Sequence, residues 1–423
     1  MGTDHLKACS FLRLAVLLMV VGSLSCRSAA SLPSTPFPDY AANNPMVHQQ
    51  GNALLDPDGR PLRLRGVNLG GWLLWEGWDF SRGGDLSENK IDQGLASIVG
   101  QPAVEQFHEA MYDQFITEDD LQAIASFGFN SVRLPINYRL LEDDDHPYVY
   151  KDSGWKRIDR ALALCEKYGL YVILDLHAVP GGQSGLAPSD PAPAEPRMWK
   201  SPEDQARTIA LWKAIAARYK DRRIVAGYDL INEPLPGNGQ KLITFYQQLI
   251  PAIRQVDPYH LLILEGTAFS GNFSNFSGPL SRNEMYGFHM YNWFGDNRQK
   301  KLDGYKGVSQ SQSVPLWAGE FGDNTYDMIA STVAMYEDPA NAVNGGWSFW
   351  TWKKVPGKYP ALVAITVPPR WQALFDWINN PKKNPQPTPA DVQAGMQDFL
   401  QAVRYGNAAV DPQMLQALTS GWR

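Results

Sequence analysis

The chain has 423 residues, of which 44% are hydrophobic, so it can bury a large core in one large domain or in two to three ordinary ones. Its formal net charge of −6 comes without a run of Lys or Arg, which gives no support to a nucleic-acid-binding role. The 14 Trp and 18 Tyr residues favour flat amphipathic ligands such as sugars, although a large core also uses many aromatic residues. Cys165 stands alone after residue 30, so the body has no internal disulfide, and its helical spacing predicts a buried apolar side chain.

The first thirty residues are typical of an export signal. Lys7 and Arg13 precede an apolar run from Leu14 to Val21, and Ser28-Ala-Ala30 provides a small-residue cleavage site. The apolar run is too short to span a membrane. We therefore expect a secreted protein, in the periplasm or outside the cell, that loses residues 1–30.

Cys26 suggests a lipoprotein form of the same signal. It follows Leu24 and Ser25, which loosely resembles a bacterial lipoprotein box, although Ser23 stands where such boxes usually carry Leu. Lipid anchoring through Cys26 is therefore an alternative to free secretion.

Next along the chain, residues 31–48 are rich in Pro, Ser, Asn and Ala and are predicted to be a leader. A short β-hairpin is predicted over residues 51–64, because Asp56-Pro-Asp-Gly59 is a favourable turn sequence. Strand-like apolar runs then alternate with helical patterns as far as residue 403. We expect one folded domain over residues 49–410 and a C-terminal tail over 411–423.

Eight apolar runs suit strands of a buried parallel sheet. These runs are 62–68, 131–136, 171–177, 224–233, 261–266, 286–291, 315–321 and 346–350. Helical patterns lie between them, at 117–126, 158–168, 202–219, 240–256 and 325–336. Thr117 is predicted to cap the first of these helices, and Gly128 and Gly169 to end the first two.

Eight strands that alternate with helices predict an α/β fold with right-handed crossovers. A doubly wound open sheet remains an alternative, but no glycine-rich phosphate loop follows the first strand, and the strand count matches a single (β/α)₈ TIM barrel. Seven prolines predict a long loop over residues 354–387, carrying Trp371 and Trp377. A helix over 389–403 is expected to close the barrel.

Functional side chains stand at the predicted carboxyl ends of the strands, where barrel enzymes build their active sites. They are Asn68, Arg133, His177, Asn232, Glu233, Glu265, His289, Tyr291, Glu320 and Trp350. Each has a structural alternative: Arg133 suits a buried ion pair, for example, and His177 a hydrogen-bonded core position. Their shared location makes purely structural roles for the whole set improbable.

The motifs around these residues resemble glycoside hydrolase family 5, the cellulase family of the retaining (β/α)₈ clan. The matching motifs, in chain order, are Arg65-Gly-Val-Asn68, Ser131-Val-Arg-Leu-Pro135, Asp175-Leu-His177, Asn232-Glu-Pro234, His289-Met-Tyr291, Gly319-Glu-Phe-Gly322 and Ser348-Phe-Trp-Thr-Trp352. The resemblance implies Glu233 as the acid/base and Glu320 as the nucleophile. It places Arg133, His177, Asn232, His289, Tyr291 and Trp350 at the remaining active-site positions.

A retaining hydrolase needs two carboxyl groups about 5–5.5 Å apart with different pKa values. Arg133 and Tyr291 are expected to favour the ionised form of Glu320. Asn232 is expected to hydrogen-bond the sugar 2-hydroxyl, and Trp350 to floor the subsite of the attacked sugar.

Other residues are weaker candidates. Trp72, with Trp75, Trp78 and Glu76, follows the first strand and forms either a sugar platform or loop packing. Glu265 is a candidate for binding a sugar hydroxyl, and Trp199 and Trp293 for subsite walls, whereas Asp175 and Asp229 lie inside strands and suit structural hydrogen bonds. No His or Cys cluster has metal-ligand spacing, so we expect neither a metal nor another cofactor.

These expectations lead to a secreted retaining β-glycosidase acting on a β-linked glucan or oligosaccharide, in the first place an endo-β-1,4-glucanase. The stretches Arg65–Trp72 and Trp347–Lys353 also resemble exo-β-1,3-glucanases of the family, so exo action, or another β-glucosidase activity, is the alternative. A remote alternative is a non-catalytic carbohydrate-binding protein. No protein partner is implied.

Overall fold

The computed structural model describes residues 44–191, 196–292, 295 and 297–422. The predicted export signal, including Cys26, lies outside the described residues, as does most of the leader. Everything below concerns the compact unit that runs from Tyr40 to Arg423. Within its described part, no helix combines the length and the apolar character that crossing a membrane would require.

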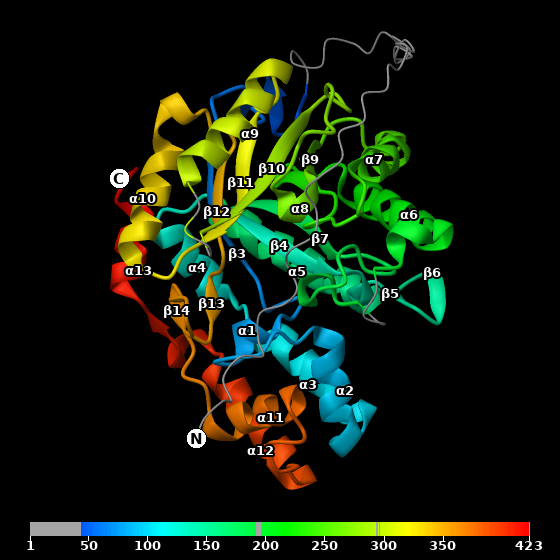
Figure 1. The fold of residues 1–423 in the computed structure, drawn as a ribbon, viewed down its shortest axis with the longest axis vertical. Helices are drawn as coiled ribbons and strands as arrows, with labels where there is room; N and C mark the ends of the chain where they lie inside the picture. Colours follow the sequence, from blue (N-terminus) through cyan, green and yellow to red (C-terminus); the bar gives the residue numbers. More distant parts are fainter. Residues whose placement is uncertain (1–43, 192–195, 293–294, 296, 423) are drawn as a thin grey trace, which may run out of the picture. The chain divides into compact units, whose positions relative to one another are not determined.

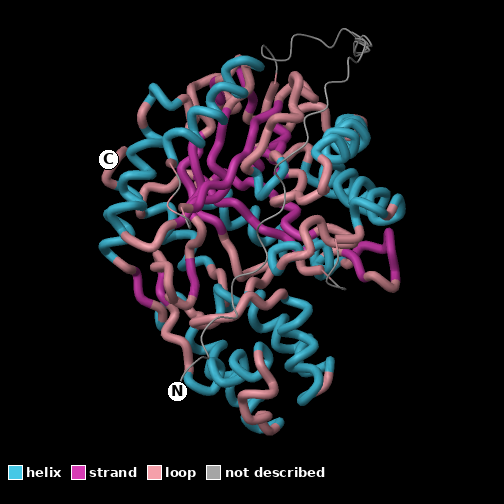
Figure 2. The backbone as a smooth tube through the Cα atoms, in the orientation of Figure 1, coloured by secondary structure: helices cyan, strands magenta, loops and turns pink. Residues whose placement is uncertain are grey.

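Eight parallel strands close into the predicted barrel, with helices packed around it (Figures 1 and 2). In order around the barrel they are β3 (Leu64–Asn68), β4 (Ser131–Asn137), β7 (Tyr171–Ala178), β8 (Val225–Asp229), β9 (Leu261–Glu265), β10 (Glu284–Tyr291), β11 (Leu316–Gly322) and β12 (Gly346–Phe349). All eight coincide with predicted runs. Strand β8 is shorter than expected, because it ends at Asp229 and leaves Glu233 in the following loop.

Five outer helices follow the predicted pattern, namely α4 (Glu118–Ser126), α5 (Asp152–Tyr168), α6 (Pro202–Tyr219), α7 (Gly239–Arg254) and α10 (Tyr326–Glu337). A sixth, α9 (Arg298–Gln312), was not predicted, because its sequence is mostly polar. Thr117 and Asp120 form a capping box at the start of α4. Gly169 ends α5 in the left-handed conformation that favours glycine. Cys165 is buried on α5, as its apolar spacing predicts.

The predicted N-terminal hairpin exists, with an antiparallel bridge between Leu55 and Pro61 across the predicted turn, and a further hairpin precedes it. Strands β1 (His48–Gln50) and β2 (Ala53–Leu55) pair across Gly51 and Asn52. Asp56-Pro-Asp-Gly59 forms the next turn, in which the Asp56 side chain accepts hydrogen bonds from the backbone N–H groups of Asp58 and Arg60, each at 2.9 Å. The predicted turn therefore forms, and an unpredicted one precedes it, because a glycine with positive φ at 51 also reverses the chain. A second, separate hairpin joins β5 (Glu142–Asp143) to β6 (His146–Tyr150).

The prediction of a long loop over 354–387 was wrong. This segment contains β14 (Val363–Ala364), which pairs with β13 (Lys353–Lys354), and then α11 (Pro369–Asn379). Trp371 is fully buried on α11 and stacks on Phe399 at 4.3 Å between ring centroids. The prolines stand at element starts and in short connections, so their number did not indicate a loop.

Helix α12 (Pro389–Ala402) forms where a helix was expected, but it does not close the barrel. The barrel closes through the pairing of β12 with β3. Helix α12 packs on α11 and on two earlier helices, α2 (Glu88–Val99) and α3 (Gln101–Gln114). We call α2, α3, α11 and α12 the four-helix layer, which Figure 1 shows together below the barrel.

The segment 411–423, expected to be a tail, is part of the folded domain as far as it is described. Strand β15 (Ala409–Val410) pairs with β14, and α13 (Pro412–Thr419) packs on α10. Met414 and Leu418 on α13 are fully buried. Four-residue spacing of these two apolar side chains gives the helix one face to bury, which accounts for its docking.

Candidate active site

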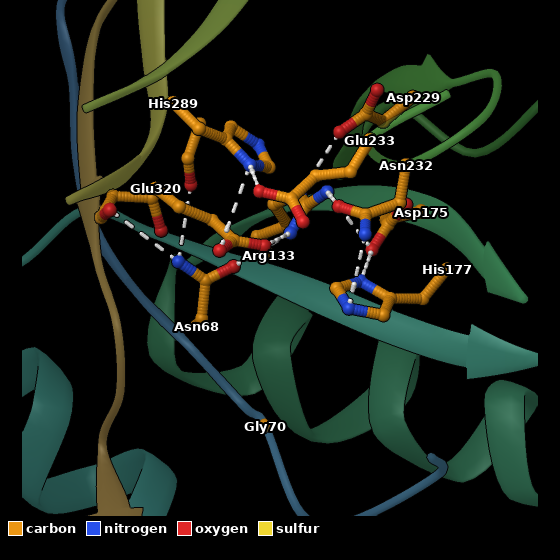
Figure 3. A network of polar contacts seen from close by, with 12 residues as sticks. Asn68, Gly70, Arg133, Asp175, His177, Asp229, Asn232, Glu233, His289 and Glu320 are labelled. Carbon is orange, nitrogen blue, oxygen red and sulfur yellow. Dashed lines mark hydrogen bonds and ion pairs between the residues drawn. The ribbon is translucent and has the colours of Figure 1, made fainter. Parts of the chain in front are cut away.

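The carboxyl ends of the barrel strands bring most of the predicted polar residues into one network (Figure 3). Glu233 reaches it from the loop that follows β8, where its backbone takes a φ of 44°, in the left-handed region. Its backbone N–H donates to Glu265 Oε2 at 2.7 Å. Such a conformation persists where neighbouring contacts hold it, and it is most frequent at functional sites.

Glu233 and Glu320 face each other across His289. One carboxylate oxygen from each glutamate and one ring nitrogen of His289 all lie within 4.8 Å of one another. His289 Nδ1 is 2.9 Å from Glu233 Oε1 and 3.6 Å from Glu320 Oε2. The two carboxyl groups are therefore close enough for one to attack an atom held between them, and closer than the roughly 6.5–9.5 Å that leaves room for an intervening water.

The surroundings of Glu320 favour its ionised form. Arg133 Nη1 donates to Glu320 Oε1 at 2.8 Å, and the Tyr291 hydroxyl donates to Oε2 at 2.8 Å. Burial by itself raises the pKa of this carboxyl, but the positive charges of His289 and Arg133 outweigh burial and hold its pKa below the ordinary value. Glu320 is thus a carboxylate suited to nucleophilic attack.

The pKa of Glu233 is shifted in the opposite direction. Burial raises it above the ordinary value, and the hydrogen bond and charge of His289 oppose this only in part. The negative charges of Glu320 and Glu265 raise it further. A carboxyl group that stays protonated beside an ionised partner can act as a general acid.

Arg133, predicted to bind substrate, lies beneath the site instead. Its side chain is fully buried and lines neither of the two cavities described below, so it is not placed to contact a substrate directly. Besides Glu320, it pairs with Asp229 at 2.9 Å, Asp175 at 3.1 Å and Glu265 at 3.3 Å. A buried guanidinium needs such partners because unpaired burial of its charge is very unfavourable. Asp175 and Asp229 thus take the structural roles expected for them.

Asn68 was also wrongly predicted to contact substrate. It is fully buried, and its Nδ2 donates to the backbone oxygen of Gly319 at 3.1 Å. Its Oδ1 accepts from Arg133 Nη1 at 3.2 Å. Asn68 therefore joins β3 to β11 just before Glu320 and holds that part of β11 in place.

Glu265 is the third correction. It is fully buried beneath Glu233 and accepts hydrogen bonds from the Glu233 backbone N–H and from the Ser270 hydroxyl. His289 Nε2 lies 3.1 Å from its Oε1. Although burial opposes it, the charges of His289 and Arg133 lower the pKa of Glu265 to about 2. It is an ionised residue that holds the backbone of Glu233 and lines neither cavity.

His177 joins this network to Glu76 and Trp350. Its Nδ1 lies 2.6 Å from Asp175 and its Nε2 3.1 Å from Glu76, with the Asn232 amide at 3.2 Å from Nε2. Burial opposes protonation, but the Asp175 carboxylate and both hydrogen bonds raise the pKa of His177 to about 10. The ring stacks on Trp350 at 5.4 Å.

A cavity of about 330 Å³ opens beside the two glutamates. Its lining contains five of the predicted site residues, namely His177, Glu233, Tyr291, Glu320 and Trp350. Residues outside the predicted substrate-binding set complete it, among them Glu76, Trp78, Asp323, Lys354 and Tyr359. We call it the first cavity.

The tryptophan cluster after β3 divides between packing and the first cavity. Trp72 is buried, with its Nε1 donating to Tyr112 O at 2.8 Å, and Trp75 stacks on His108 at 4.0 Å. Both are core residues, so Trp72 is not the predicted sugar contact. Trp78 lines the first cavity and is 36% exposed, as expected of a platform ring.

Among the other tryptophan candidates, Trp199 is buried, where its Nε1 donates to Gln183 O at 2.7 Å. It is therefore not a cavity wall, and Trp293 lies outside the described residues. Gln183 itself was missed: its amide donates to the backbone oxygens of His177 at 2.6 Å and Asn232 at 3.0 Å. It connects the loops after β7 and β8, and no sequence pattern marks it.

A second cavity, of about 580 Å³, is also lined by Glu233. Its lining includes His289 and Tyr291 and continues along α8 (Thr267–Ser270) and α9. Because Glu233 and Tyr291 line both cavities, a ligand bound beside Glu233 can extend into both.

Among the described residues, two groups of three have side chains close enough to hold a metal ion. One is Glu233, His289 and Glu320, and the other is Glu88, Asp92 and His108. In each group the histidine already pairs with a carboxylate, at 2.9 Å for Glu233 and 2.8 Å for Asp92. Hydrogen bonds between histidine and carboxylate thus explain why the side chains lie close together in both groups, without a metal ion.

Comparison with known proteins places this arrangement in a family. Residues 93–355 match the model described as cellulase (glycosyl hydrolase family 5). The chain belongs to glycosyl hydrolase family 5, and it is a glycoside hydrolase.

The similar proteins carry several activities in their names. A beta-xylosidase of Phanerodontia chrysosporium is 33% identical over 77% of this chain and 74% of its own. A probable glucan 1,3-beta-glucosidase A of Aspergillus clavatus is 28% identical over 69% of this chain and 82% of its own. An endoglucanase C of Acetivibrio thermocellus is 29% identical over 56% and 59%. The crystal structure of endogalactoceramidase shares the fold, with a TM-score of 0.55 and 22% identity over 74% of this chain and 75% of that one.

Proposed function

We propose that the protein is a retaining β-glycosidase that removes sugar from the end of a β-linked glucan, with β-1,3-glucan as the first candidate. The observation that carries this choice of exo action is Glu76. Its side chain is buried in the wall of the first cavity, next to His177, and its Oε2 has no hydrogen-bond partner within the described protein. Burial raises the pKa of Glu76 to about 8.

A buried carboxyl oxygen without a partner is unfavourable unless a ligand completes its hydrogen bonds. The free hydroxyl groups at the end of a sugar chain can donate the missing hydrogen bond to Glu76. A glucan that continues past this point has fewer free hydroxyl groups to donate it. Lys354 lines the same cavity and adds a donor. These groups favour recognition of a chain end, and so favour the exo alternative over the endo-β-1,4-glucanase first expected.

The proposed reaction is a double displacement. A Glu320 oxygen attacks the anomeric carbon, the bond to the leaving oxygen breaks, and that oxygen takes the proton of Glu233. Glu320 then loses its charge in the ester, which lowers the pKa of Glu233 because the Glu320 charge had raised it. Glu233 can now take a proton from water, whose oxygen attacks the anomeric carbon and frees Glu320. A carboxyl spacing within 4.8 Å supports retention.

The names of two relatives agree with exo action. Both beta-xylosidase and glucan 1,3-beta-glucosidase denote removal of sugars. A second candidate, endo-β-1,4-glucan hydrolysis, is favoured by the second cavity, since a long chain can extend through it, and by similarity to an endoglucanase.

The test is a substrate panel with product sizes. The protein should release monosaccharide from laminarin and laminari-oligosaccharides, and NMR should show the β-anomer forming first. Glu76→Gln should lower kcat/KM on these substrates by about tenfold, because it replaces a carboxyl oxygen that hydrogen-bonds the sugar. Release of mixed oligosaccharides from carboxymethylcellulose, with no activity on laminarin, would overturn exo action. An α-anomer as first product would overturn retention.

Export is a separate part of the proposal, supported by the N-terminal sequence pattern. Fractionation of cells expressing the full chain should place the activity outside the cytoplasm. If Cys26 carries lipid, Cys26→Ser should release the protein from membranes; an unchanged distribution would favour free secretion.

A further inference from the structure

We propose that Lys354 is a specificity-determining residue, which donates a hydrogen bond to one hydroxyl group of the chain-end sugar, and that Asp79 is the positioning residue that keeps Lys354 charged. This rests on the proposed exo-acting β-glycosidase function and assigns a contact within the same first cavity. Neither residue belongs to the predicted site.

The two side chains come from segments that pack on each other. Asp79 stands on α1 (Gly77–Phe80), the short helix after β3, and Lys354 ends β13. Figure 1 shows α1 and β13 next to each other. The backbone N–H of Val355 donates to the Asp79 backbone oxygen at 2.8 Å. This hydrogen bond fixes the backbone from which Lys354 reaches the wall of the first cavity, where Glu76 also lies.

Lys354 is a buried cation without a hydrogen-bond acceptor. It is 7% exposed, and within the described part of the chain its Nζ donates to no protein atom. The Tyr359 ring centroid lies 5.8 Å from Nζ. Burial lowers the pKa of Lys354, and the charges of Asp79 and Glu76 oppose this. An ammonium group has three N–H donors, which are unfavourable to bury unpaired, so a ligand in the first cavity can supply the missing acceptor.

Asp79 is the acidic counterpart of Lys354. It is fully buried and lines neither cavity, and neither of its carboxylate oxygens has a hydrogen-bond partner among the described residues. Burial raises the pKa of Asp79 to about 7, and the charge of Lys354 is the largest influence opposing this. The negative charge of Asp79 in turn favours the ammonium form of Lys354. Because Asp79 lies outside the cavity lining, it acts on a substrate through Lys354.

The groups beside Lys354 suit a hydroxyl group of the ligand. Glu76 Oε2, in the same wall, also has no partner among the described residues. A hydroxyl group can accept from Lys354 and can pair with Glu76 in either protonation state, because it both donates and accepts. An ammonium group on the ligand would be repelled by Lys354. Since a site built to hydrogen-bond a hydroxyl group rejects analogues that lack it, Lys354 should decide which chain-end sugars are cleaved.

The experiment removes single hydroxyl groups from the sugar. For wild type and Lys354→Met, kcat/KM is measured with 4-nitrophenyl β-glucoside and with its 3-deoxy, 4-deoxy and 6-deoxy analogues. Lys354→Met should lose about 10- to 100-fold on the glucoside, the loss of a hydrogen bond from a charged donor. It should lose less than about threefold on the one analogue that lacks the partner hydroxyl. Equal losses on all four substrates, or no loss on the glucoside, would overturn the proposal.

Lys353→Met is the matched control. Lys353 is the neighbouring buried lysine on β13 and lines neither cavity. Its Nζ donates to Phe115 O at 2.6 Å and to Val403 O at 3.0 Å. Its replacement should lower thermal stability and change kcat/KM by one common factor on all four substrates. The same substrate dependence as in Lys354→Met would show that any disturbance of β13 produces it, and would contradict the contact.

Asp79→Asn tests the positioning role. It should lose about 3- to 10-fold on the glucoside and much less on the same deoxy analogue, because it weakens the Lys354 contact without removing it. Adding Asp79→Asn to Lys354→Met should cause no further substrate-dependent loss, since Asp79 acts through Lys354. Substrate-dependent losses that add would contradict this role for Asp79.

Binding separates this inference from the proposed function. Calorimetry with 4-nitrophenyl 1-thio-β-glucoside and its deoxy analogue needs no turnover. Wild type should bind the glucoside more tightly, and Lys354→Met should remove that preference. Wild type that shows the preference but cleaves no β-glucoside would contradict the glycosidase assignment alone. Equal affinities of wild type for both compounds would contradict the Lys354 contact.

Discussion

Arg133 Nη1 donates to Glu320 Oε1 at 2.8 Å from a buried position that lines neither cavity. The charge that keeps the nucleophile ionised therefore comes from the buried floor of the barrel, where Asp175, Asp229 and Glu265 surround the same guanidinium. Because water does not reach Arg133, the electrostatic attraction between Arg133 and Glu320 is weakly screened, whether or not sugar is bound.

The first prediction concerns the nucleophile. Glu320→Gln should lower kcat by about 10⁴-fold or more on activated and unactivated glycosides alike, because both need the same attacking oxygen. Steady-state kinetics on 4-nitrophenyl β-glucoside and laminaritriose measure this. Glu284→Gln is the control: Glu284 is a buried glutamate at the other end of β10, and burial raises its pKa to about 8. Near-normal rates in Glu320→Gln would remove it as the nucleophile.

The acid/base should show leaving-group dependence. Glu233→Ala should reduce hydrolysis of poor leaving groups by roughly 10²- to 10⁴-fold and spare the first step for activated aryl glycosides. Added azide should then accelerate turnover and give a β-glycosyl azide, identified by NMR. An α-azide would mean inversion, and a uniform loss without azide rescue would assign the acid elsewhere.

Tyr291 provides a pH-dependent test. Its hydroxyl donates to Glu320 Oε2 at 2.8 Å and so favours the ionised form. Activity requires ionised Glu320, so the acidic limb of the kcat/KM profile follows its pKa. Tyr291→Phe should raise that pKa and move the acidic limb to higher pH by about one unit. An acidic limb that stays in place, or moves to lower pH, would contradict this role.

Glu265 should affect the alkaline limb of the pH profile of kcat/KM. Its negative charge raises the pKa of Glu233, which must be protonated for the first step. Glu265→Gln should lower that pKa and move the alkaline limb to lower pH. It should also reduce the free energy of unfolding by about 3 kcal/mol, since Arg133 loses one buried partner. Ser270→Ala keeps the carboxylate and should leave the alkaline limb unchanged; a shift of equal size there would point to geometry instead of charge.

Much of the fold could be predicted because barrel strands are apolar runs of the right length separated by helical patterns. All eight strands lie where those runs lie. The α11 segment could not be recognised, since its prolines mark element starts as readily as loops, and only its packing on Phe399 shows which applies. Likewise, the turn at Gly51 was not predicted, because Asp56-Pro-Asp-Gly59 close by is a more distinctive turn sequence.

At the site, position along a strand indicated which residues gather, but not which of them face the cavity. Asn68, Arg133 and Glu265 were predicted at strand ends together with His177 and Glu320, yet only the latter two line the first cavity. Depth within a barrel depends on stagger and on neighbouring side chains. Glu76 and Gln183 stand in loops, whose course the sequence pattern does not predict.

The late helices α11 and α12 pack on aromatic side chains from a much earlier part of the chain. Phe107 on α3 packs on Trp371 of α11 at 5.4 Å, and Phe80 packs on Phe399 of α12 at 5.6 Å. Both early rings also pack on Trp75, at 5.2 Å for Phe80 and 5.7 Å for Phe107. During synthesis, therefore, Trp75 can cover part of each ring before Trp371 and Phe399 are made, and the late segment covers the faces that remain.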